Sequence, residues 1–162
     1  MRIFHYECLP ERVTLFTLQI PRNLLEENFN HKSGRGSVCK LLSQSKQLVG
    51  FVDHDPQASS HGPYFKSLFS NYISDKFSVR HSFDSKRSNH LIIIKPRYEE
   101  WLITAANTQG ILLRNHKLSD DPNELHGMIP NQVTDLQKFL HFLIKKKNPS
   151  LLHLMDIAHV CK

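Results

Sequence analysis

A short apolar run that stops abruptly is the feature that most limits what this chain can fold into. Residues 47–52 read Gln-Leu-Val-Gly-Phe-Val, and the polar residues Asp53-His54-Asp55-Pro56 follow at once. A run of this length and character is typical of a strand buried on both faces, and the residues after it indicate a loop. We therefore expect a sheet with helices packed against it, which is an α/β fold.

Further strands are predicted on both sides of this run. Residues 2–7, 77–83 and 90–95 are rich in β-forming side chains, and the polar segment between the last two predicts a hairpin. Residues 24–30 fit either a helical turn or a strand. Residues 57–63, which combine serine, glycine and proline, predict a loop.

Proline and glycine residues mark the helices expected between and after these strands. One helix fits after Pro10, a second after Ser37 as its N-cap, and a third from Pro96 to a stop at Gly110. The segment 34–37, Gly-Arg-Gly-Ser, is expected to break the chain before the second helix. It lacks the full P-loop pattern, so an ordinary turn is favoured over a phosphate-binding loop.

Helical signals dominate the last third of the chain. Helices are expected to begin after Asp121, at Pro130 and after Asn148, with apolar side chains along one stripe of the longer ones. The whole pattern predicts one α/β domain over residues 1–162, built on a small, mainly parallel sheet flanked by helices. Residues 111–162 are expected to form a helical C-terminal extension packed on that domain.

Composition favours a folded protein of the cytoplasm. The chain has 162 residues, of which 40% are hydrophobic and 22% charged, which argues against disorder. Its apolar runs are far shorter than the ~20 residues of a membrane span, and its first residues do not resemble a signal peptide. Three cysteines without CxxC spacing indicate a reducing compartment, and Cys8 and Cys39 are expected to be inert thiols.

Positive charge favours an anionic partner. The chain carries 21 Lys and Arg against 15 Asp and Glu, a formal charge of +6, and nucleic acid is the commonest anionic partner of such chains. Candidate phosphate-binding residues are Arg35, Lys40, Lys95 and Arg97. For any one of them, ordinary solvated surface charge is the alternative.

Acidic side chains follow three of the predicted strands. Asp53 and Asp55 come after the central run, Glu7 ends the first strand, and Glu99 begins a helix after another. If these strands are parallel neighbours, the carboxylates converge on one rim of the sheet, where they can hold Mg²⁺. The alternatives are a surface turn at Asp53-His54-Asp55-Pro56 and favourable helix-dipole interactions at Glu99.

This order of residues resembles the Toprim family, which has a glutamate after the first strand and Asp-x-Asp after a later one. The segment Lys95-Pro96, followed by Glu99-Glu100-Trp101, is similar to a signature of small Toprim-like proteins of bacterial defence and relatives of the overcoming-lysogenization-defect nucleases. The resemblance covers about residues 1–105, and Cys8 stands where the family typically has glycine.

The resemblance implies phosphodiester cleavage that depends on Mg²⁺ or Mn²⁺, as in a nuclease subunit of a bacterial defence or toxin system. It implies that Glu7 acts as general acid/base or metal ligand and that Asp53 and Asp55 are metal ligands. Glu99 is the fourth catalytic candidate, from its place on the same rim. The second hypothesis is a non-catalytic Toprim-like module that binds nucleic acid or a partner ATPase.

Two further expectations concern partners and other metals. The chain has no ATP-binding motif, which makes a separate partner ATPase plausible, and residues 130–160 fit either a homo-oligomer interface or a cover for the sheet. The 11 histidines are scattered and match neither HExxH nor a Cys/His finger, so a structural zinc site is disfavoured.

Overall fold

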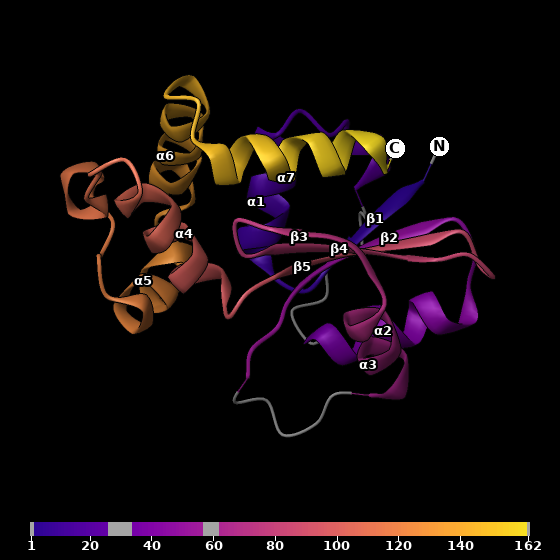
Figure 1. Ribbon diagram of the computed structural model, residues 1–162. Coiled ribbons are helices and arrows are strands. Elements are labelled where there is room, and N and C mark those ends of the chain that lie inside the picture. Colours follow the sequence, from indigo (N-terminus) through magenta and orange to yellow (C-terminus); the bar gives the residue numbers. More distant parts are fainter. Residues whose placement is uncertain (1, 26–33, 57–61, 162) are drawn as a thin grey trace.

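The computed structural model describes residues 2–25, 34–56 and 62–161, in which five strands form one sheet (Figure 1). The strand order is β1-β2-β5-β4-β3. The strands are β1 (Ile3–Tyr6), β2 (Leu48–Asp53), β3 (Tyr72–Lys76), β4 (Val79–Asp84) and β5 (Asn89–Ile94). The α/β class predicted from the sequence is confirmed.

The sheet is mixed rather than mainly parallel. β1, β2 and β5 pair in parallel, whereas β4 pairs antiparallel with both β5 and β3. The predicted hairpin explains the difference, because the short connection between β4 and β5 allows only antiparallel pairing, and a parallel crossover needs a dozen residues or more. The predicted parallel pairing therefore holds for β1, β2 and β5, the three strands that lead to the acidic residues.

Helices cover both faces of the sheet. In Figure 1, α1 (Leu9–Thr17) and α7 (Pro149–Val160) lie on one side, and α2 (Gly34–Gln44) and α3 (Pro63–Ser70) on the other. Beyond the end of the sheet lie α4 (Tyr98–Asn107), α5 (Pro122–Met128) and α6 (Val133–Lys145). Short 3-10 turns occur at Arg22–Leu24, Leu113–His116 and Ile129–Asn131.

The two helical layers explain why the central strands are apolar throughout. In β2, Phe51 belongs to the core under α1 and α7, and its neighbour Val52 to the core under α2 and α3. Ile92 and Ile93 of β5 divide between the same two cores. Since successive residues of a strand face opposite sides, a strand covered on both sides needs apolar side chains at every position.

Two of the three predicted starts of the last helices are confirmed by their caps, whereas the helix expected at Pro130 begins at Val133, because Pro130 lies in the 3-10 turn before it. The Asp121 side chain accepts hydrogen bonds from the backbone N–H groups of Asn123 and Glu124, and Asn148 caps α7 in the same way. Residues 111–161 contain helices and turns but no strand. α7 packs against β4, and α6 packs against α1.

Other local predictions were wrong or incomplete. The segment 34–37 is the first turn of α2 rather than a break before it. The helix α3, which begins at Pro63 within the predicted loop, and the strand β3 were not predicted. Of the ambiguous segment 24–30, Leu24 ends a 3-10 turn and Leu25 bridges to Phe4, while residues 26–33 and 57–61 lie outside the described residues.

Within the described residues, no helix is both long enough and apolar enough to cross a membrane.

Gly50 allows α2 to pack directly on the backbone of β2. A Cβ atom at this position would lie 2.6 Å from Leu42 Cδ1 and 2.9 Å from Leu91 Cδ1, and both leucines are fully buried. Such distances are shorter than van der Waals contact, so any side chain here would displace the core on this face.

We expect the substitution Gly50→Val to lower the free energy of unfolding by about 1–3 kcal/mol, because it overpacks this core. Urea denaturation measures the change. The matched control is Gly127→Ala, at an exposed position of α5 where a Cβ meets no atom within 4 Å. The control should leave stability unchanged or slightly raise it. Equal midpoints for Gly50→Val and the native chain would contradict this account of the packing.

Candidate functional site

Three adjacent parallel strands end at the same edge of the sheet, and each leads to an acidic residue. Glu7 follows β1, Asp53 is the last residue of β2, and Glu99 lies in the first turn of α4, shortly after β5. The register pairs Tyr6 with Phe51 and Asp53 with Ile94, so the three strand ends lie side by side. This edge is where open α/β sheets bind ligands.

A cleft of about 420 Å³ opens at this edge, and all four predicted acidic residues line it. They are Glu7, Asp53, Asp55 and Glu99. The other lining residues are Cys8, Arg97, Tyr98, Asn123 and His126. The convergence expected from the sequence is thus present in the structure.

Hydrogen bonds fix the loop that carries the aspartates. The Asp53 backbone N–H donates to Glu7 Oε2 at 3.3 Å, which links the end of β2 to the acid after β1. The N–H of His54 donates to the carbonyl of Ile94 and that of Asp55 to the carbonyl of Pro96, both at 2.8 Å. Residues 53–55 therefore follow β5 towards α4 instead of turning out into solvent, as a simple surface turn would.

Burial makes the charged forms of Asp53 and Glu7 unfavourable. Desolvation, then the neighbouring Glu7 charge, raises the pKa of Asp53 to about 7, although a hydrogen bond from the Tyr98 backbone opposes the shift. Desolvation also raises the pKa of Glu7, opposed by hydrogen bonds from the backbone of Arg35 and of Asp53. Acidic groups with raised pKa values in a cleft are typical of functional sites.

Glu99 has a partner that the sequence did not reveal. Its side chain is 3% exposed, and its Oε1 lies 2.8 Å from Nδ1 of the exposed His126. His126 belongs to α5, 27 residues further along the chain, and no motif marks it. Only the packing of α5 beside α4 brings this imidazole to the rim of the cleft.

The four predicted phosphate-binding residues have different surroundings. Arg35 is buried, and its Nη1 donates to the backbone carbonyls of Asp53 and His54, so it holds the β2 loop in place. Lys95 Nζ forms an ion pair with Asp75 at 2.6 Å. Lys40 is exposed on α2 and does not line the cleft.

Arg97 alone of these four lines the cleft. It precedes α4, and its guanidinium forms an ion pair with Glu100, 2.8 Å from Nη2 to Oε1. Its Nη1 and Nη2 also lie 3.4 Å from Asn123 Oδ1. Both members of the ion pair are partly exposed, so the pair contributes little to stability, and a ligand of the guanidinium would have to displace these contacts.

A second buried acid lies beside the cleft. Glu11, fully buried in α1, accepts hydrogen bonds from the Cys8 thiol at 2.6 Å and from the Cys8 backbone N–H at 3.1 Å. Its other oxygen, Oε1, is buried without a hydrogen-bond partner. Desolvation raises the pKa of Glu11 well above its usual range. Desolvation, and after it the neighbouring charge of Glu11, also raises the pKa of the Cys8 thiol. The thiol is therefore a poor nucleophile, as the sequence predicted.

The cleft is better suited to a hard cation that keeps most of its water ligands than to a cation whose ligands all come from the protein. Among the described residues, only His81, His90 and Cys161 bring three potential ligand atoms within 4.8 Å of one another. The carboxylates of the cleft are spaced more widely. Because Mg²⁺ usually keeps several waters and takes only one or two carboxylates directly, this spacing and this donor set are compatible with it.

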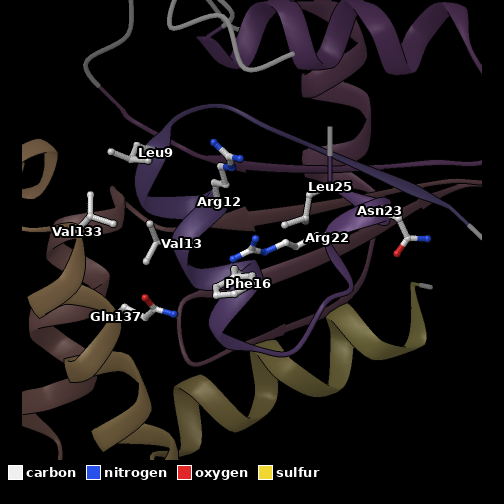
Figure 2. Close-up of a pocket in the computed structure, with 9 residues that line it drawn as sticks. All are labelled: Leu9, Arg12, Val13, Phe16, Arg22, Asn23, Leu25, Val133 and Gln137. Carbon is white, nitrogen blue, oxygen red and sulfur yellow. The ribbon is translucent and has the colours of Figure 1, made fainter. Parts of the chain in front are cut away.

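A second cleft, of about 560 Å³, lies between α1, the turn at Arg22–Leu24 and α6 (Figure 2). Its lining residues include Arg12 and Val13 of α1 and Val133 of α6, and the Arg22 guanidinium carbon lies 4.7 Å from the centre of the Phe16 ring. None of the candidate catalytic, metal-binding or phosphate-binding residues predicted from the sequence lines this cleft.

Comparison with known proteins gives no relative: no protein family, curated protein or solved structure matches this chain.

We expect protonated Asp53 to stabilise the folded state, so that the free energy of unfolding of the native chain falls relative to that of Asp53→Asn as the pH rises from 5 to 7. The pKa of Asp53 is about 7 in the folded chain and about 3.9 when unfolded, so the folded state binds the extra proton between these values. The stability linked to that proton is complete at low pH and is lost as the pH rises through 7.

Thermal denaturation at several pH values in chelator measures this effect. Asp156→Asn, which neutralises an exposed aspartate of α7, is the matched control and should follow the native curve. Parallel pH curves for Asp53→Asn and the native chain would show that Asp53 does not carry the effect.

Proposed function

We propose that this cleft binds Mg²⁺ or Mn²⁺ and hydrolyses phosphodiester bonds of nucleic acid, as a Toprim-like nuclease. The observation that supports the proposal most directly is the arrangement of Glu7, Asp53 and Asp55 at the ends of two neighbouring parallel strands in one cleft. Oxygen ligands of this kind are the ones that Mg²⁺ takes in phosphoryl-transfer sites.

Glu7, Asp53 and Asp55 are the residues that would hold the ion, one or two of them directly and the rest through its bound water molecules. A bound Mg²⁺ would neutralise charge on the scissile phosphate and lower the pKa of a water molecule. The raised pKa values of Glu7 and Asp53 support this role, because two buried acids that repel each other gain most from a cation placed between them.

Proton transfer falls to the acids of the same cleft. The pKa of Asp53 is about 7 without a cation, and a bound cation would favour its charged form and so remove it from proton transfer. Glu7 would then be the general acid/base, as the family resemblance implies. Glu99 Oε1 forms a hydrogen bond of 2.8 Å with His126 Nδ1 and so orients that imidazole at the rim of the cleft.

The substrate contact proposed for this chain is Arg97. Its guanidinium stands at the rim of the cleft and is partly exposed, and its planar fork matches a phosphate group. The net charge of +6 supports a polyanionic substrate in general. A role in a bacterial defence or toxin assembly, with a partner ATPase, is part of this proposal through the Toprim resemblance.

We expect the purified chain to cut plasmid DNA or RNA with Mg²⁺ or Mn²⁺ and to be inactive in EDTA. Glu7→Gln and Asp53→Asn should each lower the rate at least about 100-fold, because each removes a carboxylate that acts on the ion or on a proton. Asp156→Asn, on the exposed surface of α7, should keep the native rate. Gel assays of cleavage against time measure these rates.

Full activity in both variants would exclude this cleft as the catalytic site. Binding of nucleic acid without cleavage under every metal would instead support the non-catalytic module.

A further inference from the structure

Three metal-binding side chains meet in the core, away from the acidic cleft. His81 lies on β4, His90 on β5, and Cys161 directly after α7. Their exposed fractions are 6%, 8% and 0%. His90 is near the amino end of β5, whereas the acidic cleft lies beyond its carboxyl end, so the two places are at opposite ends of that strand.

The distances between these side chains are close to those of a tetrahedral metal site. His81 Nε2 lies 3.5 Å from Cys161 Sγ and 2.9 Å from His90 Nδ1, and one ligand atom from each residue lies within 4.8 Å of the others. For zinc bonds of about 2.05 Å to nitrogen and 2.3 Å to sulfur, tetrahedral geometry separates two nitrogens by about 3.3 Å and a nitrogen from sulfur by about 3.6 Å. The two separations from His81 are close to these values, and the third, between His90 and Cys161, is below 4.8 Å.

The type of donor selects a different class of ion from the acidic cleft. Two imidazoles and a thiolate are ligands of Zn²⁺ and of similar transition-metal ions, whereas Mg²⁺ binds oxygen. The trio contains no oxygen ligand. It would therefore select Zn²⁺ by chemistry even where Mg²⁺ is in large excess.

Both imidazoles are uncharged, but the hydrogen bond between His81 Nε2 and His90 Nδ1 places a proton on one of these nitrogens, so metal binding would move that proton to the other nitrogen of its ring. Desolvation lowers the pKa of His81, and desolvation with the neighbouring His81 lowers that of His90 to about 4, so both rings are neutral and have lone pairs at pH 7. Burial raises the pKa of Cys161 to about 12, while the Arg2 charge lowers it. Metal binding would release the thiol proton to solvent.

The trio also joins parts of the chain that are far apart in sequence. His81 and Cys161 are separated by 80 positions, and α7 packs against β4. An ion held here would tie the end of α7 to the two strands below it. A metal that binds only the folded chain stabilises it by its binding free energy.

We propose that His81, His90 and Cys161 form a binding site for Zn²⁺ or a similar transition-metal ion, which ties the end of α7 to β4 and β5. Three protein ligands leave the fourth position to water or to a small exogenous ligand. The effect argued for the ion is to stabilise the fold, and the site is separate from the proposed Mg²⁺ cleft.

Cobalt and zinc titrations of the chelator-treated, reduced 162-residue chain test the site. We expect one equivalent of Co²⁺ to bind and to produce a thiolate-to-cobalt charge-transfer absorption, which requires a cysteine ligand. Zn²⁺ should displace the Co²⁺ and abolish that absorption. Zn²⁺ at about 100 times its dissociation constant should raise the melting temperature by about 5–10 °C.

Matched cysteine variants identify the ligand. Cys161→Ser and His90→Gln should lose the charge-transfer absorption and the thermal shift. Cys39→Ser, at a buried cysteine of α2, and Cys8→Ser, at the cysteine of the acidic cleft, should keep both. Circular dichroism establishes that each variant is folded.

Three results would overturn the proposal. One is the absence of the charge-transfer absorption in the native chain, which no folding defect of a variant can explain. Another is its loss in Cys8→Ser with retention in Cys161→Ser, which would place the ion in the acidic cleft. The third is retention in both Cys161→Ser and His90→Gln. None of these results depends on whether the protein cleaves nucleic acid.

Discussion

Parallel pairing of β1, β2 and β5 is the constraint on which the rest of the structure depends. Helices cover β2 and β5 on both faces, and their residues contribute to the core on each side, whereas β1 contributes only Phe4 and Tyr6, to the core under α1 and α7. These buried side chains fix the register of the three strands. Acidic residues are therefore tolerated only where each strand leaves the core, at its carboxyl end. Parallel pairing then brings those ends to one edge, and the acidic cleft is a consequence of how the core is packed.

The same arrangement forces negative charges together in a partly buried place. The charge of Arg35 lowers the pKa of Glu7, but its guanidinium is held by the carbonyls of Asp53 and His54 and does not offset the desolvation of either acid. The result is a raised pKa at both Glu7 and Asp53. A cation from solution would relieve this repulsion, and this is the physical reason for proposing a metal-dependent function for the cleft.

Much of the sheet and the acidic set could be predicted from the sequence, because their signals are local. The run 47–52 shows its burial by being apolar at nearly every position, and Asp121 and Asn148 show helix starts by their own capping chemistry. β3 was missed because it is a largely exposed edge strand without an apolar pattern. The partners of Glu99 and Lys95, which are His126 and Asp75, come from tertiary packing that no local spacing records.

The histidines illustrate the same limit in a stronger form. Their spacing in sequence fits no zinc motif, yet His81 and His90 become neighbours because β4 and β5 pair in one particular register, with His81 opposite Ile92 and His90 opposite Phe83. Cys161 reaches them only because α7 packs on β4. A shift of either strand by one residue would send one imidazole to the other face of the sheet. The proposed zinc site therefore depends on the hairpin register as strictly as the proposed magnesium cleft depends on the parallel pairing, and β5 is the strand that both share.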